Sequence, residues 1–440
     1  MNTKRGFVTT LVDRFATRRL GFPPETCSYT VTGVRIPVLD DGSKQLELAA
    51  DLYNLPYGRG LAIALLSARP YAARGYQCLL VSCRGTFGSG GEFDPWRNEE
   101  EDGHAVVEWM RNQDWYTGSF ATLGGSYLGF VQWALLRNPP SDMVAAVIQC
   151  APHGFSQQLW GTGSLALEWI TWGENVAHQE ETGVFQILKA LNTPKRMRPA
   201  LDRVPLAEGV KSHFKGRAPW LDFVRAEIPI FLRNANVALL MGPWNHMRVG
   251  QVSRVYRQSF DWLEEHLAKR MQGTRKTSVQ YFVTGTKEWR DVQNWPPLTH
   301  ARELYLRSGG RLARGGSADD TGLAARCDAL AFTTEVTVEL SHSSDNPHAD
   351  LFVRISEVDA NTETYKRLDP GREGGPVILY LNDCAHRFVK GNRIRLIIAG
   401  ASHPQFAINT GQGIGGTSDI LMIIGADKGF KARRGYTIRS

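Results

Sequence analysis

A serine in a glycine-rich segment is the first residue of this sequence that could do covalent chemistry. Gly124-Gly125-Ser126-Tyr127-Leu128-Gly129 lies between a predicted strand and a predicted helix. A turn of this kind lifts the serine hydroxyl clear of a sheet edge, and its glycines permit a strained backbone and close packing. The N–H of Tyr127, at the helix start, would then face a developing oxyanion. The segment predicts a nucleophilic Ser126, with a purely structural turn as the alternative, because the second glycine stands one position later than usual.

A histidine after a later strand could supply the base that a nucleophilic serine needs. The segment Gly242-Pro243-Trp244-Asn245-His246 directly follows the apolar run Val237–Met241. A single histidine more often has a structural role. The order of a serine, then a histidine after the last central strand, is nevertheless typical of hydrolases built on such a sheet. We therefore predict that His246 accepts the proton of Ser126.

Other motifs offer weaker sites. The loop Arg84–Gly91 is rich in glycine but lacks the Lys-Ser/Thr ending of a phosphate-binding loop, and no helix follows it directly, so a structural connection is expected. The histidines of the second half are expected on the surface or in the fold: His342, His348, His386 and His403. Cys-x-x-Cys and His-Glu-x-x-His spacings do not occur, so we expect neither a metal nor a cofactor.

The elements that would position Ser126 and His246 alternate between strand and helix. Two strand-like runs flank the turn Asp40-Asp41-Gly42 between residues 28 and 53. The following elements are expected as a strand at 76–83, a helix at 99–113 behind the cap Asn98, a strand at 120–123, a helix at 127–137 and a strand at 144–149. This order predicts a parallel sheet covered on both faces.

Two segments depart from that order. Residues 152–225 contain several helix-length stretches and no convincing strand, with a basic loop around Lys195–Pro199, which favours a helical insertion. The sheet resumes at Val237–Met241, before an amphipathic helix at 255–270. From about residue 275 short strands and turns predict a β-sandwich, with strands at Val279–Val283, Glu303–Leu306, Val336–Leu340, Leu351–Ile355 and Ile394–Ile398.

Composition is that of an ordinary globular protein. The chain has 440 residues, so two or three domains are expected, since single cores stop growing near ~250–300 residues. The net charge of +7 is dispersed, and we expect no nucleic-acid or membrane partner. The first 19 residues lack the apolar core of a signal peptide, and the six cysteines lie mostly in apolar runs. A cytoplasmic protein with buried thiols is expected.

Three motifs, taken in order, resemble the cocaine esterase and X-prolyl dipeptidyl-peptidase group of serine hydrolases. They are Arg84–Phe93, then Gly125–Gly129 with Gln132-Trp133 after it, then Gly242–His246. The resemblance runs from about residue 28 to residue 410. It implies α/β plus all-β architecture, in which an α/β-hydrolase sheet with a helical cap insertion is followed by a jelly-roll β-sandwich.

The same resemblance implies domain bounds and a mechanism. The hydrolase domain would span 28–271, with the cap at about 152–225, and the jelly-roll would span 276–440. Ser126 would form an acyl-enzyme with His246 as base. The oxyanion hole would consist of the Tyr127 amide and the hydroxyl of Tyr57, in the Pro-Tyr loop. The substrate would be a small-molecule ester or a short peptide, with the choice between them and a homo-oligomeric state left open.

The sequence departs from the family where the triad acid should stand. The family places this acid in a Gly-Trp-x-Asp-like loop between two strands, and no such motif occurs here. Strand, acid loop, helix and strand do not fit between Ile228 and Met241, because a parallel crossover alone needs about a dozen or more residues. Asp222 and Glu227 lie nearest in chain order, but neither follows a strand. The triad acid is therefore unassigned.

A central strand is also missing upstream. Asp51–Asn54 joins directly to Leu55-Pro56-Tyr57, although the family has another strand before its Pro-Tyr loop, and Thr333–Glu335 and Asn361–Glu363 are shortened too. Such losses indicate omitted coding segments or a decayed enzyme. The alternative to a serine hydrolase is therefore a catalytically silent relative that acts as a binding or assembly module.

Overall fold

The computed structural model divides the chain into two compact units. The first contains Met1–Gly154, Ile228–Asn236 and Trp244–Lys276, and the second contains Phe155–Glu227, Val237–Pro243 and Thr277–Ser440. The residues described are 2–4, 6–40, 44–53, 67–152, 165–180, 184–204, 206–218, 237–295 and 297, with the strands and short segments given below between 303 and 439. Tyr57, Asp222 and Glu227 lie outside these ranges.

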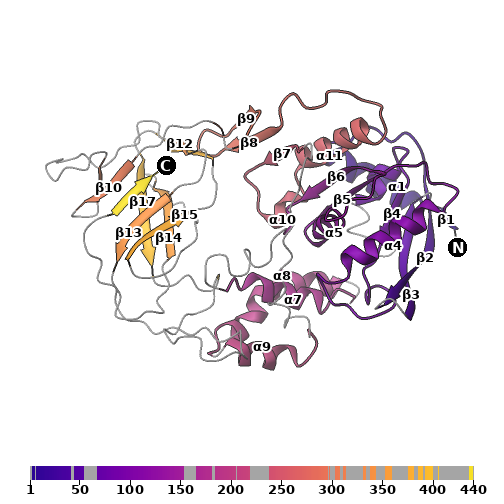
Figure 1. Ribbon diagram of the computed structural model, residues 1–440, viewed down its shortest axis with the longest axis horizontal. Coiled ribbons are helices and arrows are strands. Elements are labelled where there is room, and N and C mark those ends of the chain that lie inside the picture. The colour runs from indigo at the N-terminus through magenta and orange to yellow at the C-terminus, as the bar shows by residue number, and fades with distance from the viewer. Residues whose placement is uncertain are drawn as a thin grey trace. The chain divides into compact units, whose positions relative to one another are not determined.

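An antiparallel sheet opens the first unit (Figure 1). Its strands, in spatial order, are β1 (Asn2–Lys4), β2 (Thr30–Asp40), β3 (Lys44–Tyr53) and β4 (Cys78–Val81). β2 and β3 pair along their whole length around the turn predicted at Asp40-Asp41-Gly42, so the predicted hairpin is confirmed. β4 then pairs with the second half of β3. The helices α1 (Phe7–Arg19) and α3 (Arg69–Ala72) belong to the same unit.

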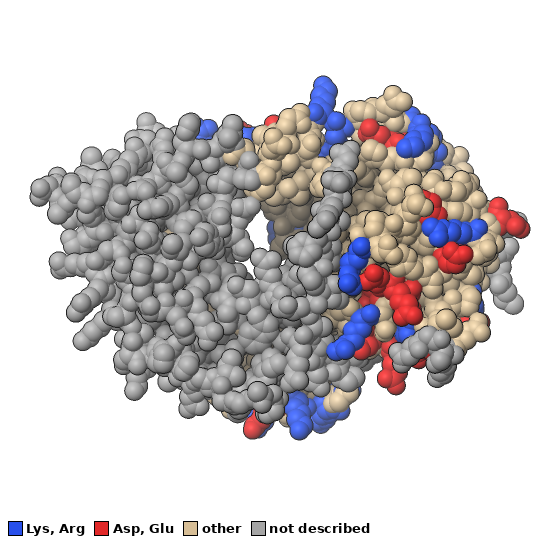
Figure 2. Space-filling view, in the orientation of Figure 1, with Lys and Arg blue, Asp and Glu red and all other residues tan. Residues whose placement is uncertain are grey.

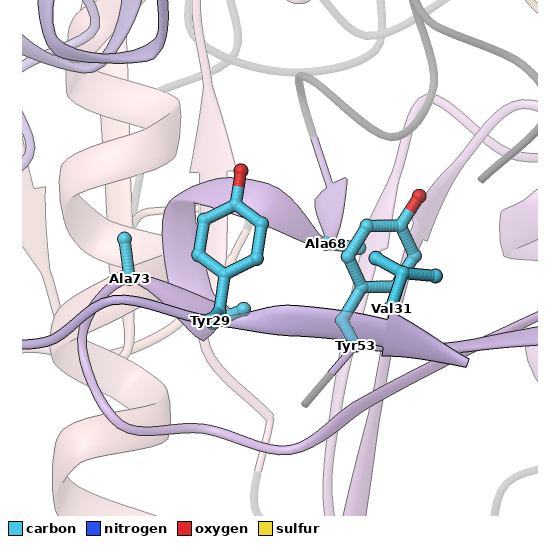
Figure 3. Close-up of a cluster of buried hydrophobic side chains, with 6 residues drawn as sticks. Tyr29, Val31, Tyr53, Ala68 and Ala73 are labelled. Atoms are coloured by element: carbon cyan, nitrogen blue, oxygen red, sulfur yellow. The ribbon is translucent and has the colours of Figure 1, made fainter. Parts of the chain in front are cut away.

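Aromatic side chains fix the end of this sheet. Tyr29, just before β2, and Tyr53, at the end of β3, point to the same side, beside Val31, Ala68 and Ala73 (Figure 3). All five residues are buried. This packing anchors Tyr53, the last residue of β3.

A parallel pair of strands follows. β5 (Phe120–Gly125) and β6 (Met143–Gln149) run parallel, with a register shift between Phe120 and Ala121. In the sequence they flank α5 (Tyr127–Leu135), which comes after α4 (Glu99–Arg111). The sequence predicted each of these elements, and the structure confirms them. Asn98 precedes α4 as predicted, although its side chain makes no capping hydrogen bond.

Helices cover both faces of β5. Ala121 and Leu123 pack against α11 (Ser253–His266), whereas the hydroxyl of Thr122 donates a 2.9 Å hydrogen bond to Gln132 of α5. Successive side chains of a strand point to opposite faces. α5 and α11 therefore lie on opposite faces, as the β-α-β-α-β order predicted.

Ion pairs link surface side chains of this unit. Arg111 pairs with Asp142 at 2.7 Å, and Arg137 pairs with Glu100 at 2.6 Å. On the face shown in Figure 2, the basic and acidic side chains of the described residues are intermixed. Among the helices that the structure describes, none is long and apolar enough to cross a membrane.

Three helices of the second unit occupy the predicted insertion. They are α7 (Glu168–Val176), α8 (Val184–Leu201) and α9 (Leu206–Phe214). The expected basic loop at Lys195–Pro199 is wrong, because α8 runs through it. Met197 and Leu201 are buried on one side of this helix, and Arg196 forms an ion pair with the buried Glu174 of α7. Tertiary packing outweighs the helix-breaking tendency of the two prolines here.

A second correction concerns Val279–Val283, which the sequence predicted as the first sandwich strand. This strand, β8, instead pairs in parallel with β7 (Leu239–Met241) and antiparallel with β9 (Glu288–Val292). The buried residues Val279, Tyr281 and Val283 pack with Leu239 and Met241, so burial of an apolar face explains the pairing.

The remaining described strands pair antiparallel. One sheet has the order β11 (Arg311–Ala313), β10 (Glu303–Arg307), β18 (Tyr436–Arg439), β13 (Thr337–His342) and β15 (Gly375–Tyr380). Separate pairs join β14 (Phe352–Val358) to β17 (Arg393–Ala399), and β12 (Ala331–Phe332) to β16 (His386–Arg387). The all-β character of this half agrees with the sequence pattern, and the jelly-roll topology stays a prediction.

Candidate active site

Ser126 lies in the turn between β5 and α5. Its backbone has φ 57° and ψ −125°, in a region that a non-glycine residue rarely adopts. The N–H of Ser126 donates to the carbonyl of Gln149 at 2.9 Å, and the Ser126 carbonyl accepts from Gly129 and Phe130. Such strain costs about 1–3 kcal/mol and persists where the surroundings enforce it, often at functional sites. The structure thus places Ser126 in the geometry of a nucleophile turn.

Two glycines make this turn sterically feasible. A Cβ atom on Gly124 would come within 2.5 Å of Cβ of Leu128, and one on Gly129 within 2.4 Å of Cβ of Ala151. Gly129 therefore marks the point where α5 crosses the end of β6. The late second glycine of the motif is explained by this crossing, because Leu128 at the usual position packs against Gly124 instead.

Replacing Gly129 by alanine is expected to destabilise the protein. The added methyl group must displace Ala151 or shift α5, and overpacking of this kind costs about 1–3 kcal/mol. Urea unfolding of the variant would measure the loss. Gly103→Ala, in the neighbouring helix α4, is the matched control, since its new Cβ would meet only Leu135, at 3.4 Å. That control should be neutral or stabilising by up to about 1 kcal/mol. Equal stability of the two variants would contradict the crossing argument.

The side chain of Tyr127 is held by contacts with Trp96 and Glu99. Its hydroxyl donates to Glu99, the backbone N–H of Trp96 donates to the same hydroxyl at 3.4 Å, and the Trp96 ring lies 4.5 Å from the Tyr127 ring. Burial raises the pKa of Tyr127 well above its ordinary value. As the first residue of α5, Tyr127 has a backbone N–H with no acceptor inside the helix. That orientation suits an oxyanion donor.

His246 begins the short helix α10 (His246–Val249). Asn245 caps this helix, with its side chain accepting from the N–H of Arg248 at 3.0 Å. His246 is exposed. No hydrogen bond joins His246 to Ser126, although both are described, and no described carboxylate bonds to His246. The pairing of Ser126 with His246 therefore stays a prediction, and the described part of the chain shows no carboxylate bonded to the histidine.

The sequence reading missed Glu99 as a buried group. It lies in the first turn of α4, where acidic residues are common on the surface because they interact favourably with the helix dipole. Glu99 is 7% exposed, and burial raises its pKa to about 7. The helical spacing of Glu99, Gly103, Val106 and Met110 places it on the inward face, a signal that could have identified it.

The Arg84–Gly91 loop is structural, as expected. Arg84 forms ion pairs with Asp102 at 2.5 Å and Asp40 at 2.7 Å, and it is only 5% exposed. Ser89 bridges two chain segments by accepting from the N–H of Ala49 and donating to the carbonyl of Ser82. These groups are committed to the fold and do not form a phosphate site.

The expectation of buried thiols holds only in part. Burial raises the pKa of both Cys78 and Cys83 to about 12. Cys27 and Cys150 are exposed, however, because they lie in a connecting segment and at the end of β6. The four described cysteines are free thiols.

Comparison with known proteins supports the reading of the motifs. Residues 42–203 match the family described as X-Pro dipeptidyl-peptidase (S15 family). Cocaine esterase from Rhodococcus species strain MB1 Bresler is 24% identical over 480 positions, which cover 80% of this chain and 82% of that protein. Because 480 positions exceed the length of this chain, the relative has residues with no counterpart here. The alignment therefore agrees with internal shortening.

Solved structures share the fold. An aminopeptidase from a marine sediment Thaumarchaeota archaeon has a TM-score of 0.62 at 15% identity, covering 95% of both chains. A CocE/NonD family hydrolase from Staphylococcus aureus has a TM-score of 0.58 at 13% identity, covering 96% of this chain and 97% of that one. The likeness supports an α/β-hydrolase fold. Together, the motifs, the family match and the shared fold confirm the resemblance to the X-prolyl dipeptidyl-peptidase and cocaine esterase group of hydrolases.

Proposed function

We propose that this protein is a serine hydrolase of the X-prolyl dipeptidyl-peptidase or acyl esterase type. The observation that carries the proposal is the conformation of Ser126, with positive φ between a parallel strand and the helix that follows it. The family match and the relatives support a hydrolase of the esterase or peptidase kind. The substrate is a small-molecule ester or a short peptide, and the protein acts in the cytoplasm.

The reaction proceeds through an acyl-enzyme. Oγ of Ser126 attacks the substrate carbonyl carbon while His246 accepts the hydroxyl proton, and the carbonyl electron pair moves to oxygen. The N–H of Tyr127 and the hydroxyl of Tyr57 stabilise that oxyanion. The tetrahedral intermediate collapses, and the alcohol or amine leaves with the proton from His246. Water, activated by His246, then hydrolyses the ester on Ser126.

The mechanism requires the His246 ring to reach Oγ of Ser126. Since His246 is exposed and not bonded to Ser126, substrate binding or rearrangement of the 244–250 segment must bring its ring to Oγ. The same observation favours the second candidate, a catalytically silent relative whose helical insertion (152–225) and jelly-roll (276–440) serve as a binding or assembly module. Only activity distinguishes the two.

Release of nitrophenolate from p-nitrophenyl acetate by the purified chain is the direct test. We expect turnover that is weak but above that of Ser126→Ala, because the nucleophile is in place while the acid is unassigned. An Ala-Pro p-nitroanilide, assayed in parallel, separates peptidase from esterase specificity. If neither chromogenic substrate is cleaved faster by the chain than by Ser126→Ala, the protein is a silent relative.

A further inference from the structure

Aromatic rings surround the side chain of Tyr127, the residue that follows Ser126. The ring centroids of Phe93, Trp96 and Phe130 lie 6.1, 4.5 and 6.0 Å from that of Tyr127. Trp96 is 3% exposed and meets the Phe130 ring edge-on, with 4.8 Å between centroids. Aromatic pairs at such separations prefer defined geometries. The Tyr127 ring is therefore fixed against the segment that precedes α4.

The same segment contains a second strained backbone. Trp96 has φ 78°, a positive value that a bulky residue rarely adopts. Its backbone N–H donates to the Tyr127 hydroxyl at 3.4 Å. Tyr127 thus links two strained residues, Trp96 through its side chain and Ser126 through its peptide bond. Strain of this kind persists where surrounding contacts enforce it, and it is often found at functional sites.

A buried carboxylate also holds Tyr127. Oε1 of Glu99 accepts a hydrogen bond from the Tyr127 hydroxyl, and Glu99 is 7% exposed. The described titratable groups that interact electrostatically with Glu99 are Tyr127 from α5, Asp102 from the same helix and Cys83 from the segment after β4. Asp102 is already held by two hydrogen bonds from Arg84, and burial raises the pKa of the Cys83 thiol to about 12, so this thiol is uncharged. Tyr127 is therefore the described side chain that binds the Glu99 carboxylate.

The charge of Glu99 does not stabilise the fold. Burial, with a smaller contribution from Asp102, raises the pKa of Glu99 to about 7. Because this folded-state pKa lies above the ordinary value of a carboxyl group, the stability that Glu99 contributes is present at acidic pH and is lost as the pH rises through about 7. An ionised Glu99 therefore opposes folding at alkaline pH, and a purely structural role does not account for it.

The contact with Tyr127 acts in the opposite direction to burial. The hydrogen bond from the Tyr127 hydroxyl lowers the pKa of Glu99. Because such coupling is reciprocal, the ionised carboxylate binds this hydroxyl more tightly than the neutral acid does. Glu99 therefore holds Tyr127 most firmly above about pH 7.

The backbone N–H of Tyr127 is restrained by the same contacts. It is the first N–H of α5 and has no acceptor inside the helix. Its peptide group adjoins the Cα atom that carries the anchored ring, so the ring restricts movement of this N–H. An oxyanion donor is effective only within about 2.7–3.1 Å of the charge that it stabilises. Small movements of the Tyr127 side chain therefore matter for the reaction at Ser126.

We propose that Glu99, in its ionised form, is a positioning residue for the Ser126 site, where it acts through the Tyr127 hydroxyl to fix the N–H of Tyr127 as the oxyanion donor. This role rests on the hydrolase function proposed above. No hydrogen bond joins Glu99 to Ser126, both of which are described, so the influence of Glu99 passes through Tyr127.

The ¹⁵N chemical shift of the Tyr127 amide tests this coupling without any activity. In the full chain labelled with ¹⁵N-tyrosine, the signal is identified by its loss in Tyr127→Phe. We expect it to titrate with a midpoint at about pH 7 and to stop doing so in Glu99→Gln. Glu101→Gln removes an exposed carboxylate from the same helical turn and should keep the titration. A Tyr127 amide that does not titrate in the wild-type chain, or that titrates equally in Glu99→Gln, would overturn the proposal.

The rate of fluorophosphonate labelling at Ser126 tests the effect on the site. At pH 8.5, Glu99→Gln should be labelled about tenfold more slowly than Glu101→Gln, the loss of one charge-assisted hydrogen bond. At pH 5.5 Glu99 is itself protonated, so the two variants should be labelled at equal rates. Adding Glu99→Gln to Tyr127→Phe should slow labelling no further, because both changes remove the same bond. Additive effects, or equal slowing at both pH values, would contradict the role of the ionised carboxylate.

Urea unfolding at pH 8.5 separates positioning from a structural role. Glu99→Gln removes a buried charge, so it should be at least as stable as Glu101→Gln. Slower labelling with a matching loss of stability would show that Glu99 holds the fold, and it would overturn the proposal. If Ser126 is not labelled in the wild-type chain, the hydrolase function itself is wrong, whereas the titration of the Tyr127 amide still decides whether Glu99 is coupled to that N–H.

Discussion

Ser126→Ala should abolish covalent labelling by a fluorophosphonate and reduce ester turnover to the level of the buffer. The probe reacts with an activated serine hydroxyl, and among the described residues Ser126 is the one serine that lies between a strand and a helix at positive φ. In hydrolases with a complete triad, loss of the nucleophile costs about 10⁶ in kcat. The starting activity here is expected to be low, so labelling followed by peptide mapping is the more sensitive measurement.

Ser141→Ala is the control for this experiment. Ser141 is exposed and lies before β6, outside the turn, so its loss should leave labelling unchanged. A modified peptide that contains a serine other than Ser126, or undiminished labelling of Ser126→Ala, would show that the nucleophile has been misassigned. Circular dichroism would confirm that both variants are folded, which the small size of the Ser→Ala change favours.

Local sequence signals predicted the elements around Ser126 because those elements depend on local physics. The apolar run before Gly124 forms β5, and the helical spacing after Ser126 forms α5. The glycines at 124 and 129 are required by contacts of 2.5 and 2.4 Å that any side chain would create. The motif, the periodicity and the turn residues all indicate the same local structure here, and such agreement makes the structure predictable from the sequence.

Other features depend on partners distant in the sequence. Helix α8 continues through Pro194 and Pro199 because Met197 is buried and Arg196 meets Glu174 of α7. The pairing of β8 with β7 could not be predicted either. Alternating apolar residues indicate which face of a strand is buried, but they do not indicate which strand lies beside it. The burial of Glu99 follows from Tyr127, 28 residues away.

The positions of Tyr57 and of the acid stay predictions for a different reason. Both depend on strands that the family has and this sequence lacks, and residues 54–66 and 219–236 lie outside the described structure. The pairing of the described strands is consistent with a missing strand. β4 and β5 each have one free edge, and β6 pairs with β5 alone among the described strands. We predict that the loss of a strand affects the site by removing the support of a residue and by exposing a sheet edge.

Inserting the missing acid unit after Ile230 should raise ester turnover by about 10⁴-fold. The insertion consists of a family-like strand, a Gly-Trp-x-Asp loop and a helix, followed by the native chain from Phe231. A triad acid fixes the tautomer of the histidine and stabilises its charged form, and its loss costs about 10⁴ in kcat when the geometry is otherwise intact. Without it, the exposed His246 has no described carboxylate to orient it, so the native chain should be a poor catalyst.

The matched control carries the same insertion with asparagine in place of its aspartate. Both insertions restore a strand and cover sheet edges, so any gain from stability alone appears in both proteins. Only the aspartate form supplies the negative charge that His246 needs as it accepts the Ser126 proton. The ratio of kcat between the two insertions on p-nitrophenyl acetate therefore isolates the acid. If the native chain already equals the aspartate insertion, another carboxylate orients His246, and the argument from the missing loop is wrong.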